Sequence, residues 1–521
     1  MRPFPKRLNH PGAYRPDRSL ARQFCPSPKP VPDMSATYWR AARADKASVI
    51  IDAEDYFRFA RDAMLKARRR IMLIGWDFDA RIALVRGDRL ENEEIEAPAT
   101  IGDLVYWLVE RNPDLEVYLL RWDLGAFTSL FRGKTIFTVA KWMMHPRIQV
   151  RLDKHHPPAA SHHQKIVVID DAFAFCGGID MTADRWDTRD HADEEACRIR
   201  PGGTPAPPWH DATTALQGPV AAALGKHARD RWKRATGEQI EGLRGKHDCW
   251  PDDLPVQFTD VEVTISRTAP RMDDQREVTE IEALYLEQIA RAKNWIYAES
   301  QYFASRRIAE AIARRLDEPD GPEIVIVTPE SAWGWLEPLA MDTARARIVQ
   351  ALRQRDKHGR LKIYHPYTRD REAIYVHAKI FIVDDTILRV GSSNLNNRSL
   401  RLDTECDVAI DCAAQGNTDC TKTIAAIRND LIAEHTGTSV DKVEAALARS
   451  GSLIETIETL RFTGRRNARK RRRTLMPYKV PNLSSVEAWL ADNQILDPEG
   501  PDEMFEAPDR RGLFRRFGLW H

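Results

Sequence analysis

The chain has 521 residues, of which 43% are hydrophobic and 30% are charged, and its formal net charge at pH 7 is +1. Such a chain is long enough for two large domains and can fill a sizeable core, while its balanced charge singles out no partner. No apolar run approaches the length that crosses a bilayer, which excludes a membrane-spanning helix, and the charged N-terminus has no apolar segment behind it. We therefore expect a cytoplasmic protein with neither a signal peptide nor a transmembrane segment.

Residues 1–45 are rich in Pro and Arg, and we expect them to form an extended arm that packs little. After the arm, helical spacing of apolar residues alternates with short β-branched runs. The first half predicts a helix beginning near Asp52, a strand at Ile71–Gly75, a helix at Ile101–Arg111, a strand at Leu115–Leu120 and a helix at Gly218–Arg234. This alternation is typical of an α/β sheet, which binds ligands at the carboxyl ends of its strands.

The second half repeats this order of elements. It predicts a helix at Val278–Lys293, a strand at Trp295–Ala298, a helix at Ile308–Leu316 and a strand at Glu323–Thr328. A repeat of about 200 residues indicates duplicated domains rather than a repeat array. We expect an arm at 1–45, a first repeat at 46–240, a linker at 241–262, a second repeat at 263–420 and a C-terminal extension at 421–521.

One short pattern occurs in both halves. The first copy contains His163, Lys165 and Asp170, and the second contains His377, Lys379 and Asp384 with the same spacing. His and Lys are two residues apart at the head of a β-branched run, so a strand would place both side chains on one face. The Asp ends the run and lies an odd number of residues from the His and Lys, so a strand would point its side chain to the opposite face. We interpret it as an anchor for the turn before the glycines. Each copy is followed, after the same gap, by small residues that include Gly177, Gly178 and Asp180 in the first half and Gly391, Ser392 and Asn394 in the second.

Two imidazoles, two lysines and an amide can together cleave a phosphodiester without a metal. One neutral imidazole attacks phosphorus and forms a phosphohistidine, while the other protonates the departing alkoxide and later takes a proton from water. Lysine and asparagine side chains stabilise the charge on the phosphate oxygens. Each imidazole needs a partner that sets its tautomer and pKa. The candidates are Glu194 or Glu195 in the first half and Glu405 in the second.

The His and Cys residues raise the question of two other kinds of site, a metal site and a disulfide framework. Histidines at positions 155, 156, 162 and 163 suggest zinc, but two of them precede a Pro-Pro turn and no Cys or carboxylate has a ligand spacing, so we expect no metal and no other cofactor. The seven cysteines are odd in number and form no Cys-x-x-Cys pair, which favours reduced thiols over a disulfide framework. They are Cys25, Cys176, Cys197, Cys249, Cys406, Cys412 and Cys420.

The doubled motif resembles that of the phospholipase D superfamily, and the resemblance covers residues 50–410. Further segments are similar to the eukaryotic-type branch: His162–Lys165, Gly177–Asp180, Arg185–Asp187, Pro208–Asp211, Glu299–Phe303 and Ser393–Arg398. The resemblance implies an α/β fold of two pseudo-symmetric α-β-α sandwich domains with mixed sheets and an active site at their interface.

The same resemblance implies roles for individual residues. His163 would be the nucleophile and His377 the general acid and base. The implied catalytic set is His163, Lys165, Asp170, His377, Lys379 and Asp384, and the implied phosphate-binding set is Lys165, Lys379, Asn394 and Asp180. Asp180 stands where the other repeat has an amide. The expected supporting residues are Glu194, Glu195, Glu405, Gly177, Gly178, Gly391 and Ser392.

The C-terminal extension differs in character from both repeats. It predicts helices at Thr421–His435 and Val440–Leu460, and then carries seven positive charges in the nine residues from Arg465. The last residues interleave cations with large apolar groups, as interfacial segments do. We interpret both stretches as a contact of a monomeric, peripheral protein with anionic phospholipids. Nucleic acid, which we do not expect, is the rival partner.

The expected activity is that of a phospholipase D, which releases phosphatidic acid and a free alcohol from phosphatidylcholine-like lipids. When an alcohol outcompetes water, head-group exchange is expected instead. Two alternatives stay open: a phosphatidyltransferase of the cardiolipin synthase type and a catalytically silent membrane-binding scaffold. A nuclease is less favoured, because nucleases of this superfamily are often short chains with one motif.

Overall fold

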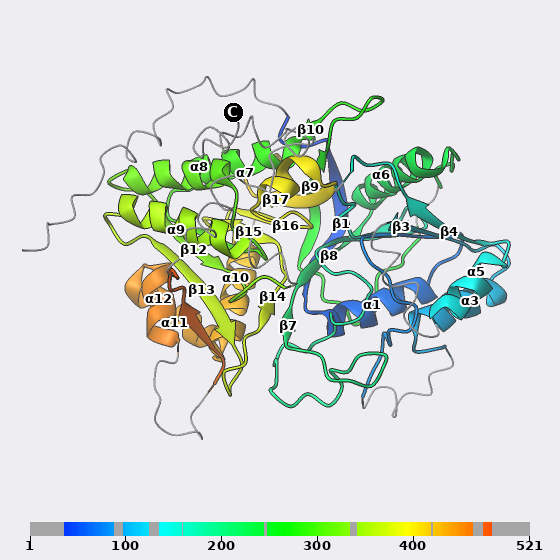
Figure 1. Ribbon diagram of the computed structural model, residues 1–521, viewed down its shortest axis with the longest axis horizontal. Coiled ribbons are helices and arrows are strands. Elements are labelled where there is room, and N and C mark those ends of the chain that lie inside the picture. The colour runs from blue at the N-terminus through cyan, green and yellow to red at the C-terminus, as the bar shows by residue number, and fades with distance from the viewer. Residues whose placement is uncertain are drawn as a thin grey trace, which may run out of the picture. The chain divides into compact units, whose positions relative to one another are not determined.

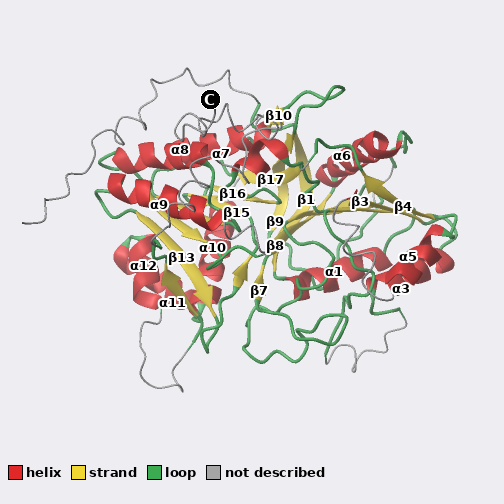
Figure 2. Ribbon diagram, in the orientation of Figure 1, coloured by secondary structure: helices red, strands yellow, loops and turns green. Residues whose placement is uncertain are grey.

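A computed structural model describes residues 36–87, 97–123, 135–158, 160–243, 247–333, 341–417, 420–461 and 472–481. Most of the strands in these residues belong to one sixteen-stranded mixed sheet that runs through both halves of the chain (Figures 1 and 2). The first half contributes β1 (Arg40–Ile51), β2 (Arg70–Gly75), β3 (Glu116–Trp122), β4 (Ile148–Asp153), β5 (Ile166–Ile169), β6 (Phe173–Gly177) and β8 (Ala212–Gln217). The second half contributes β9 (Phe258–Ala269), β10 (Val278–Thr279), β11 (Trp295–Glu299), β12 (Glu323–Val327), β13 (Leu361–Tyr367), β15 (Ile380–Val383), β16 (Ile387–Gly391) and β17 (Glu405–Asp411).

The order of the strands shows the internal duplication. From the centre outward, the first half runs β1-β8-β6-β5-β2-β3-β4 and the second runs β9-β17-β16-β15-β11-β12-β13. The outer three strands of each half are parallel, and the inner pairs are antiparallel. At the centre β1 pairs antiparallel with β9, with Ala44 opposite Val261. The two halves are therefore related by a pseudo-twofold axis between β1 and β9, which confirms the expected pseudo-symmetric α/β fold.

Helices cover both faces of the sheet in each half (Figure 2). They are α1 (Ala53–Leu65), α3 (Ile101–Arg111), α5 (Thr135–Met143), α6 (Pro219–Thr236), α7 (Glu280–Arg291), α8 (Arg306–Asp317), α9 (Thr343–Arg355), α10 (Cys420–Thr436), α11 (Val440–Ser450) and α12 (Leu453–Leu460). Phe57 and Leu104 join α1 and α3 to one face of the first-half sheet, while Trp232 of α6 packs on the other face. Burial of these apolar stripes supplies most of the driving force that holds each layer in place.

The predicted elements of both halves are present within a few residues of their expected ends. Polar side chains fix two of the helix starts, because the Thr100 side chain accepts a hydrogen bond from Asp103 N and the Ser305 side chain accepts one from Ile308 N. The single helix expected at Val440–Leu460 is wrong. Gly451 has a φ of +64° and Ser452 caps a new helix, so α11 ends there and α12 begins.

The C-terminal extension is part of the sheet and of its helical layer. β18 (Thr474–Pro477) pairs antiparallel with β13 at the sheet edge, and α10 follows β17 as α6 follows β8. α10 is therefore the counterpart of α6 and belongs to the second repeat. The expected boundary at 421 wrongly divides this helix from the rest of its repeat. The expected boundaries at 46 and 262 fall inside β1 and β9.

The expectation of reduced thiols is wrong for one pair of cysteines. Cys412 and Cys420 form a disulfide that links the end of β17 to the start of α10, where the chain brings the two Cα atoms to 5.8 Å. Among the described residues, Cys176, Cys197, Cys249 and Cys406 form no disulfide bond. The Pro- and Arg-rich arm up to residue 35, the basic run up to residue 471 and the terminal apolar residues lie outside the described residues. Among the residues that are described, no helix is long and apolar enough to cross a membrane.

Candidate active site

The two motif histidines are held by backbone contacts that cross from one half of the chain to the other. His163 N donates to Thr404 O at 2.9 Å, and His377 N donates to His210 O at 2.7 Å. Next to these contacts, β7 (Trp209–His210) pairs with β14 (Tyr375–Val376) in a small sheet of their own. Each motif segment thus lies against the opposite repeat. The imidazole ring centroids of His163 and His377 are 6.2 Å apart, which places both rings at the interface of the halves.

Each imidazole is paired with a buried carboxylate from the other repeat. His163 Nδ1 lies 3.1 Å from both oxygens of Glu405, and His377 Nδ1 lies 2.7 Å from Asp211 Oδ2. Because Nδ1 faces a carboxylate, we assign the proton of each neutral ring to Nδ1. Nε2 then carries the free lone pair and is the nitrogen available for reaction. The pairing is symmetric, because Glu405 begins β17 and Asp211 immediately precedes the equivalent strand, β8.

This pairing corrects the partners that the sequence suggested. Glu405 binds the imidazole of the first half instead of that of the second. Glu194 is exposed, and Glu195 accepts a hydrogen bond from Cys197 N at 2.9 Å. The sequence suggested that each half supplies the carboxylate for its own imidazole. In the structure each motif segment lies against the other half, which supplies the carboxylate instead. Asp211 was missed, and its only signal was its place in the segment Pro208–Asp211.

Burial and neighbouring cations keep both imidazoles neutral in the free site. Burial lowers the pKa of His163 well below its usual value, and the charges of Lys165 and Lys379 lower it further. Burial and the charges of Lys379 and Arg185 act in the same way on the pKa of His377. Burial also raises the pKa of Glu405 to about 8 and lowers that of Lys379 to about 7. A bound phosphate anion would offset the lysine charges and make protonation of an imidazole easier.

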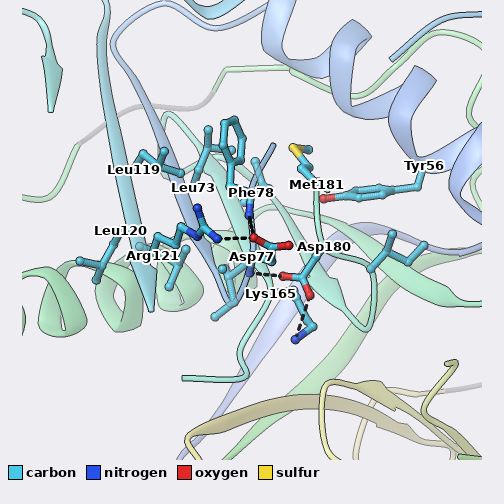
Figure 3. A pocket seen from close by; sticks show the side chains of 15 residues that line it. Tyr56, Leu73, Asp77, Phe78, Leu119, Leu120, Arg121, Lys165, Asp180 and Met181 are labelled. Atoms are coloured by element: carbon cyan, nitrogen blue, oxygen red, sulfur yellow. Dashed lines mark hydrogen bonds and ion pairs between the residues drawn. The ribbon is translucent and has the colours of Figure 1, made fainter. Parts of the chain in front are cut away.

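The motif lysines are fixed by the backbone of their own motif. Lys165 Nζ donates to His163 O at 2.7 Å, and Lys379 Nζ donates to His377 O. Figure 3 shows the carboxylate of Asp180 between Lys165 and the backbone at Asp77, in a cavity that neither imidazole lines. Asp180 Oδ2 lies 3.3 Å from Lys165 Nζ, and its Oδ1 accepts from Trp76 N at 3.1 Å. Asp180 is therefore a partner of Lys165, and its expected phosphate-binding role is corrected because a carboxylate would repel the anion.

The side chain of Asn394, the expected phosphate-binding amide, is held loosely. Its side chain is buried, and its Nδ2 lies at the long distance of 3.5 Å from Gln301 Oε1. Its Oδ1 has no hydrogen-bond partner among the residues that the structure describes. The amide is thus weakly held and can donate to a phosphate oxygen.

The motif aspartates are structural, and their expected place in the catalytic set is corrected. Asp170 accepts hydrogen bonds of 2.7–2.8 Å from the backbone N–H groups of residues 68–70, and Asp384 accepts bonds of 2.6–2.9 Å from those of residues 293–295. Both lie in two-residue turns with φ of +54° and +50°, a conformation that Asp tolerates better than most residues. Their side chains thus anchor the starts of β2 and β11, whereas the sequence suggested that they hold the turn after their own strand.

The small residues after each motif allow close approach of neighbouring side chains and backbone. A Cβ on Gly178 would lie 2.4 Å from Asp211 Oδ1, and one on Gly177 would lie 2.3 Å from Thr213 Cα. In the second repeat a Cβ on Gly391 would overlap the Asp407 carboxylate, and Ser392 Oγ donates to Glu405. Of these residues, Gly178 and Ser392 contact the carboxylates that pair with the imidazoles.

Aromatic side chains flank both imidazoles, and the sequence did not single them out as site residues. Trp76 stacks on Trp122 at 6.0 Å and lies 6.3 Å from the His163 ring. On the other side, the Trp209 ring lies 5.3 Å from His377 and stacks on Tyr375 at 4.6 Å. Tyr375 also contacts Trp333, whose side chain is exposed.

The other clustered histidines have separate partners. His155 lies 3.0 Å from Asp274, His156 lies 2.9 Å from Asp123, and His162 lies 3.1 Å from Asp153. Within the described part of the chain, they do not converge with His163 on one metal position.

Comparisons with known proteins agree with the geometry of this site. The sequence model of the family described as "Phospholipase D" matches residues 63–308, and that of "Cardiolipin synthase, PLD-like domain" matches residues 285–426. Phospholipase D alpha 4 of Arabidopsis thaliana is 23% identical in an alignment that covers 88% of this chain and 71% of the relative. Phospholipase D alpha 1 of Carica papaya is 24% identical over 67% of this chain and 58% of its own length, so this chain spans little more than half of that relative.

A solved structure shows the same fold. Phosphatidylserine synthase of Haemophilus influenzae Rd KW20 superposes with a TM-score of 0.52 at 13% identity, over 81% of this chain and 96% of that one. The two family matches together include both motifs, the crossed imidazole–carboxylate pairs and the amide of Asn394. The chain therefore belongs to the phospholipase D superfamily and is close to its eukaryotic type.

Proposed function

We propose that the chain is a phosphodiesterase of the phospholipase D type, which hydrolyses the distal phosphodiester bond of phosphatidylcholine-like lipids through a phosphohistidine. The observation that carries the proposal is the pair of neutral, buried imidazoles, His163 and His377, each with Nδ1 on a carboxylate. An in-line displacement needs a nucleophile and an acid on opposite sides of phosphorus, each about 3–3.5 Å from its reacting atom. The ring centroids lie 6.2 Å apart, so the two imidazoles can flank one phosphoryl group bound between them.

In the first step His163 Nε2 attacks phosphorus, and the bond from phosphorus to the head-group oxygen breaks. The low pKa of His163 keeps this nitrogen unprotonated at neutral pH. Lys165, Lys379 and Asn394 stabilise the charge on the phosphoryl oxygens. The products of this step are a phosphatidyl-histidine and the head-group alcohol.

His377 protonates the leaving oxygen in that step and then takes a proton from the attacking water. Its contact with Asp211 is 2.7 Å, whereas His163 lies 3.1 Å from Glu405 and shares its Nδ1 with Ser392 O. The shorter ionic contact favours the imidazolium form at His377 once an anion is bound. This asymmetry supports His163 as the nucleophile and His377 as the acid and base.

The head group leaves on the side of His377, where Tyr375 and Trp333 present aromatic surface. Aromatic faces attract quaternary ammonium groups, which supports a choline-type head group. An alcohol that enters on the same side in place of water would give head-group exchange. For membrane contact, we propose that the basic run from Arg465 binds anionic phospholipids and that the chain acts as a monomer, because it carries both motifs.

Product analysis on mixed phospholipid vesicles, with and without a primary alcohol, tests this function. We expect phosphatidic acid and free choline without alcohol, and a phosphatidyl alcohol in its presence, with both lost in His163→Ala and His377→Ala. Transfer of phosphatidyl groups between lipids without release of phosphatidic acid would instead identify a phosphatidyltransferase. No turnover of any phospholipid would identify a silent scaffold.

A further inference from the structure

A second group of histidines and carboxylates lies in the interior next to the segment that carries Asp211. It consists of Asp52 before α1, His191 in the loop that follows β6, His210 at the end of β7, and Glu434 in α10. The four side chains are at most 2% exposed. They come from four separate parts of the chain, one of them in the C-terminal extension.

One ring nitrogen of each histidine lies close to both carboxylates. His210 Nδ1 is 2.8 Å from Glu434 Oε1 and 3.1 Å from Asp52 Oδ1. His191 Nε2 is 3.2 Å from Glu434 Oε1 and 3.5 Å from Asp52 Oδ2. A tetrahedral zinc ion with bonds of about 2.0–2.1 Å holds its ligands about 3.3 Å apart, and these four separations bracket that value.

The opposite nitrogen of each histidine ring is bound to a further carboxylate. His210 Nε2 lies 2.7 Å from Glu299 Oε2, and His191 Nδ1 lies 2.9 Å from Asp187 Oδ2. Glu299 is itself held by Tyr297 and His435. This is the arrangement found around metal-bound histidines, in which an outer carboxylate accepts the remaining N–H and turns a lone pair toward the ion.

Two of the converging atoms have no hydrogen-bond partner in the described part of the chain. They are His210 Nδ1 and Asp52 Oδ2, and both are fully buried. The oxygens near His210 Nδ1 lie at bonding distance but outside hydrogen-bond geometry. Buried polar atoms are rarely left in this state, because water has been removed without replacement. A cation between the four side chains would satisfy both atoms.

We propose that Asp52, His191, His210 and Glu434 bind one divalent transition-metal ion, and that zinc suits this four-coordinate set of two nitrogens and two oxygens best. This proposal differs from the expectation of no metal, which rested on the histidines at positions 155, 156, 162 and 163 and not on these four residues. The site is separate from the reacting imidazoles, and no step of the reaction passes through the ion.

The position of this site gives the ion a structural role toward the active site. Asp52 N donates to Asp211 O at 2.8 Å, and Asp211 N donates to Asp52 Oδ1 at 3.1 Å. His210 O accepts from His377 N at 2.7 Å. The ion would therefore fix the segment that holds Asp211 against His377, and Glu434 would join α10 to it.

Metal analysis of the purified full chain tests the proposal without any substrate. The protein is produced without a histidine tag, purified without chelators and assayed for transition metals and calcium by mass spectrometry. We expect about one zinc per chain in the wild type, and less than about a fifth of that in His191→Gln and Glu434→Gln. His435→Gln is the matched control, because it removes a buried histidine that contacts Glu299 and leaves all four ligands in place; it should keep its zinc.

A wild-type chain that contains no metal and takes up none when zinc is added would overturn the proposal. So would zinc that stays at full occupancy in both ligand variants, since it would then be bound elsewhere. If the variants do not fold, X-ray absorption on the wild type decides instead. The proposal requires four nitrogen or oxygen neighbours at about 2.0 Å, with imidazole scattering, and a sulfur neighbour at about 2.3 Å would refute it.

Discussion

Replacing Asp211 with Asn tests whether this carboxylate acts through the proton of His377. Asp211 Oδ1 accepts from Ala212 N at 2.8 Å, so the Asn carbonyl can keep that contact while its NH₂ group faces His377 Nδ1. Nδ1 must then accept a hydrogen bond, which moves the ring proton to Nε2. His377 can no longer take a proton from water, and its imidazolium form loses its counter-charge. We expect kcat on phosphatidylcholine to fall by about 10²- to 10⁴-fold.

Two substrates separate this effect from a general loss of structure. A phospholipid with p-nitrophenol as its head group needs no acid for departure, so the first-turnover burst of p-nitrophenol should stay within about tenfold of the wild type in Asp211→Asn. Turnover after the burst should be slow, because water must still be deprotonated. Glu405→Gln should lose the burst itself, and Glu194→Gln, at an exposed carboxylate, is the control that should lose nothing. A burst that is lost in Asp211→Asn as fully as turnover of phosphatidylcholine would refute the reasoning.

Three further predictions concern stability, pH and membrane binding. Asp170→Asn weakens three backbone hydrogen bonds and should lower the free energy of unfolding by about 1–3 kcal/mol in urea titrations, while the folded protein keeps its kcat. A loss of kcat without a loss of stability would show instead that Asp170 takes part in the reaction. Because the charge of Lys165 helps to hold the pKa of His163 low, Lys165→Gln should raise that pKa and move the acid limb of kcat/KM to higher pH, and an unmoved limb would contradict the assignment. Replacing the four cations of residues 465–470 with Gln should weaken binding to acidic vesicles by about 1 kcal/mol per charge, while hydrolysis of a short-chain soluble lipid stays unchanged. If the variant bound acidic vesicles as tightly as the wild type, the basic run would have no role in membrane binding.

The sheet and the motif residues could be predicted because their signals are local. β-branched runs, helical periodicity and capping residues such as Thr100 act within a few residues, and the duplication made each half a check on the other. The break between α11 and α12 also had a local signal, Gly451 followed by Ser452, which the apolar periodicity obscured. The position and parity of the motif aspartates indicated an anchoring role, but they did not show that the anchored segments are the starts of β2 and β11.

The partners of the imidazoles could not be predicted because they depend on how the two halves cross. Glu405 is 242 residues from His163, and Asp211 is 166 residues from His377. Nothing in the spacing shows which half supplies which carboxylate. The same holds for the buried group around His210, whose members meet only in the folded chain. Cys412 and Cys420 are only eight residues apart, but seven cysteines without a Cys-x-x-Cys pair gave no sign that these two would bond.

The covalent intermediate is the central claim, and trapping it is the most direct test. Wild-type enzyme is mixed with labelled phosphatidylcholine-like substrate, denatured at high pH within the first turnover, digested and sequenced by mass spectrometry. We expect an acid-labile phosphatidyl group on His163 and none in His163→Ala, with a larger trapped fraction in Asp211→Asn because its second step is slow. A phosphatidyl group on His377 would reverse the two roles, and the absence of label from both histidines at times when product forms would contradict the mechanism.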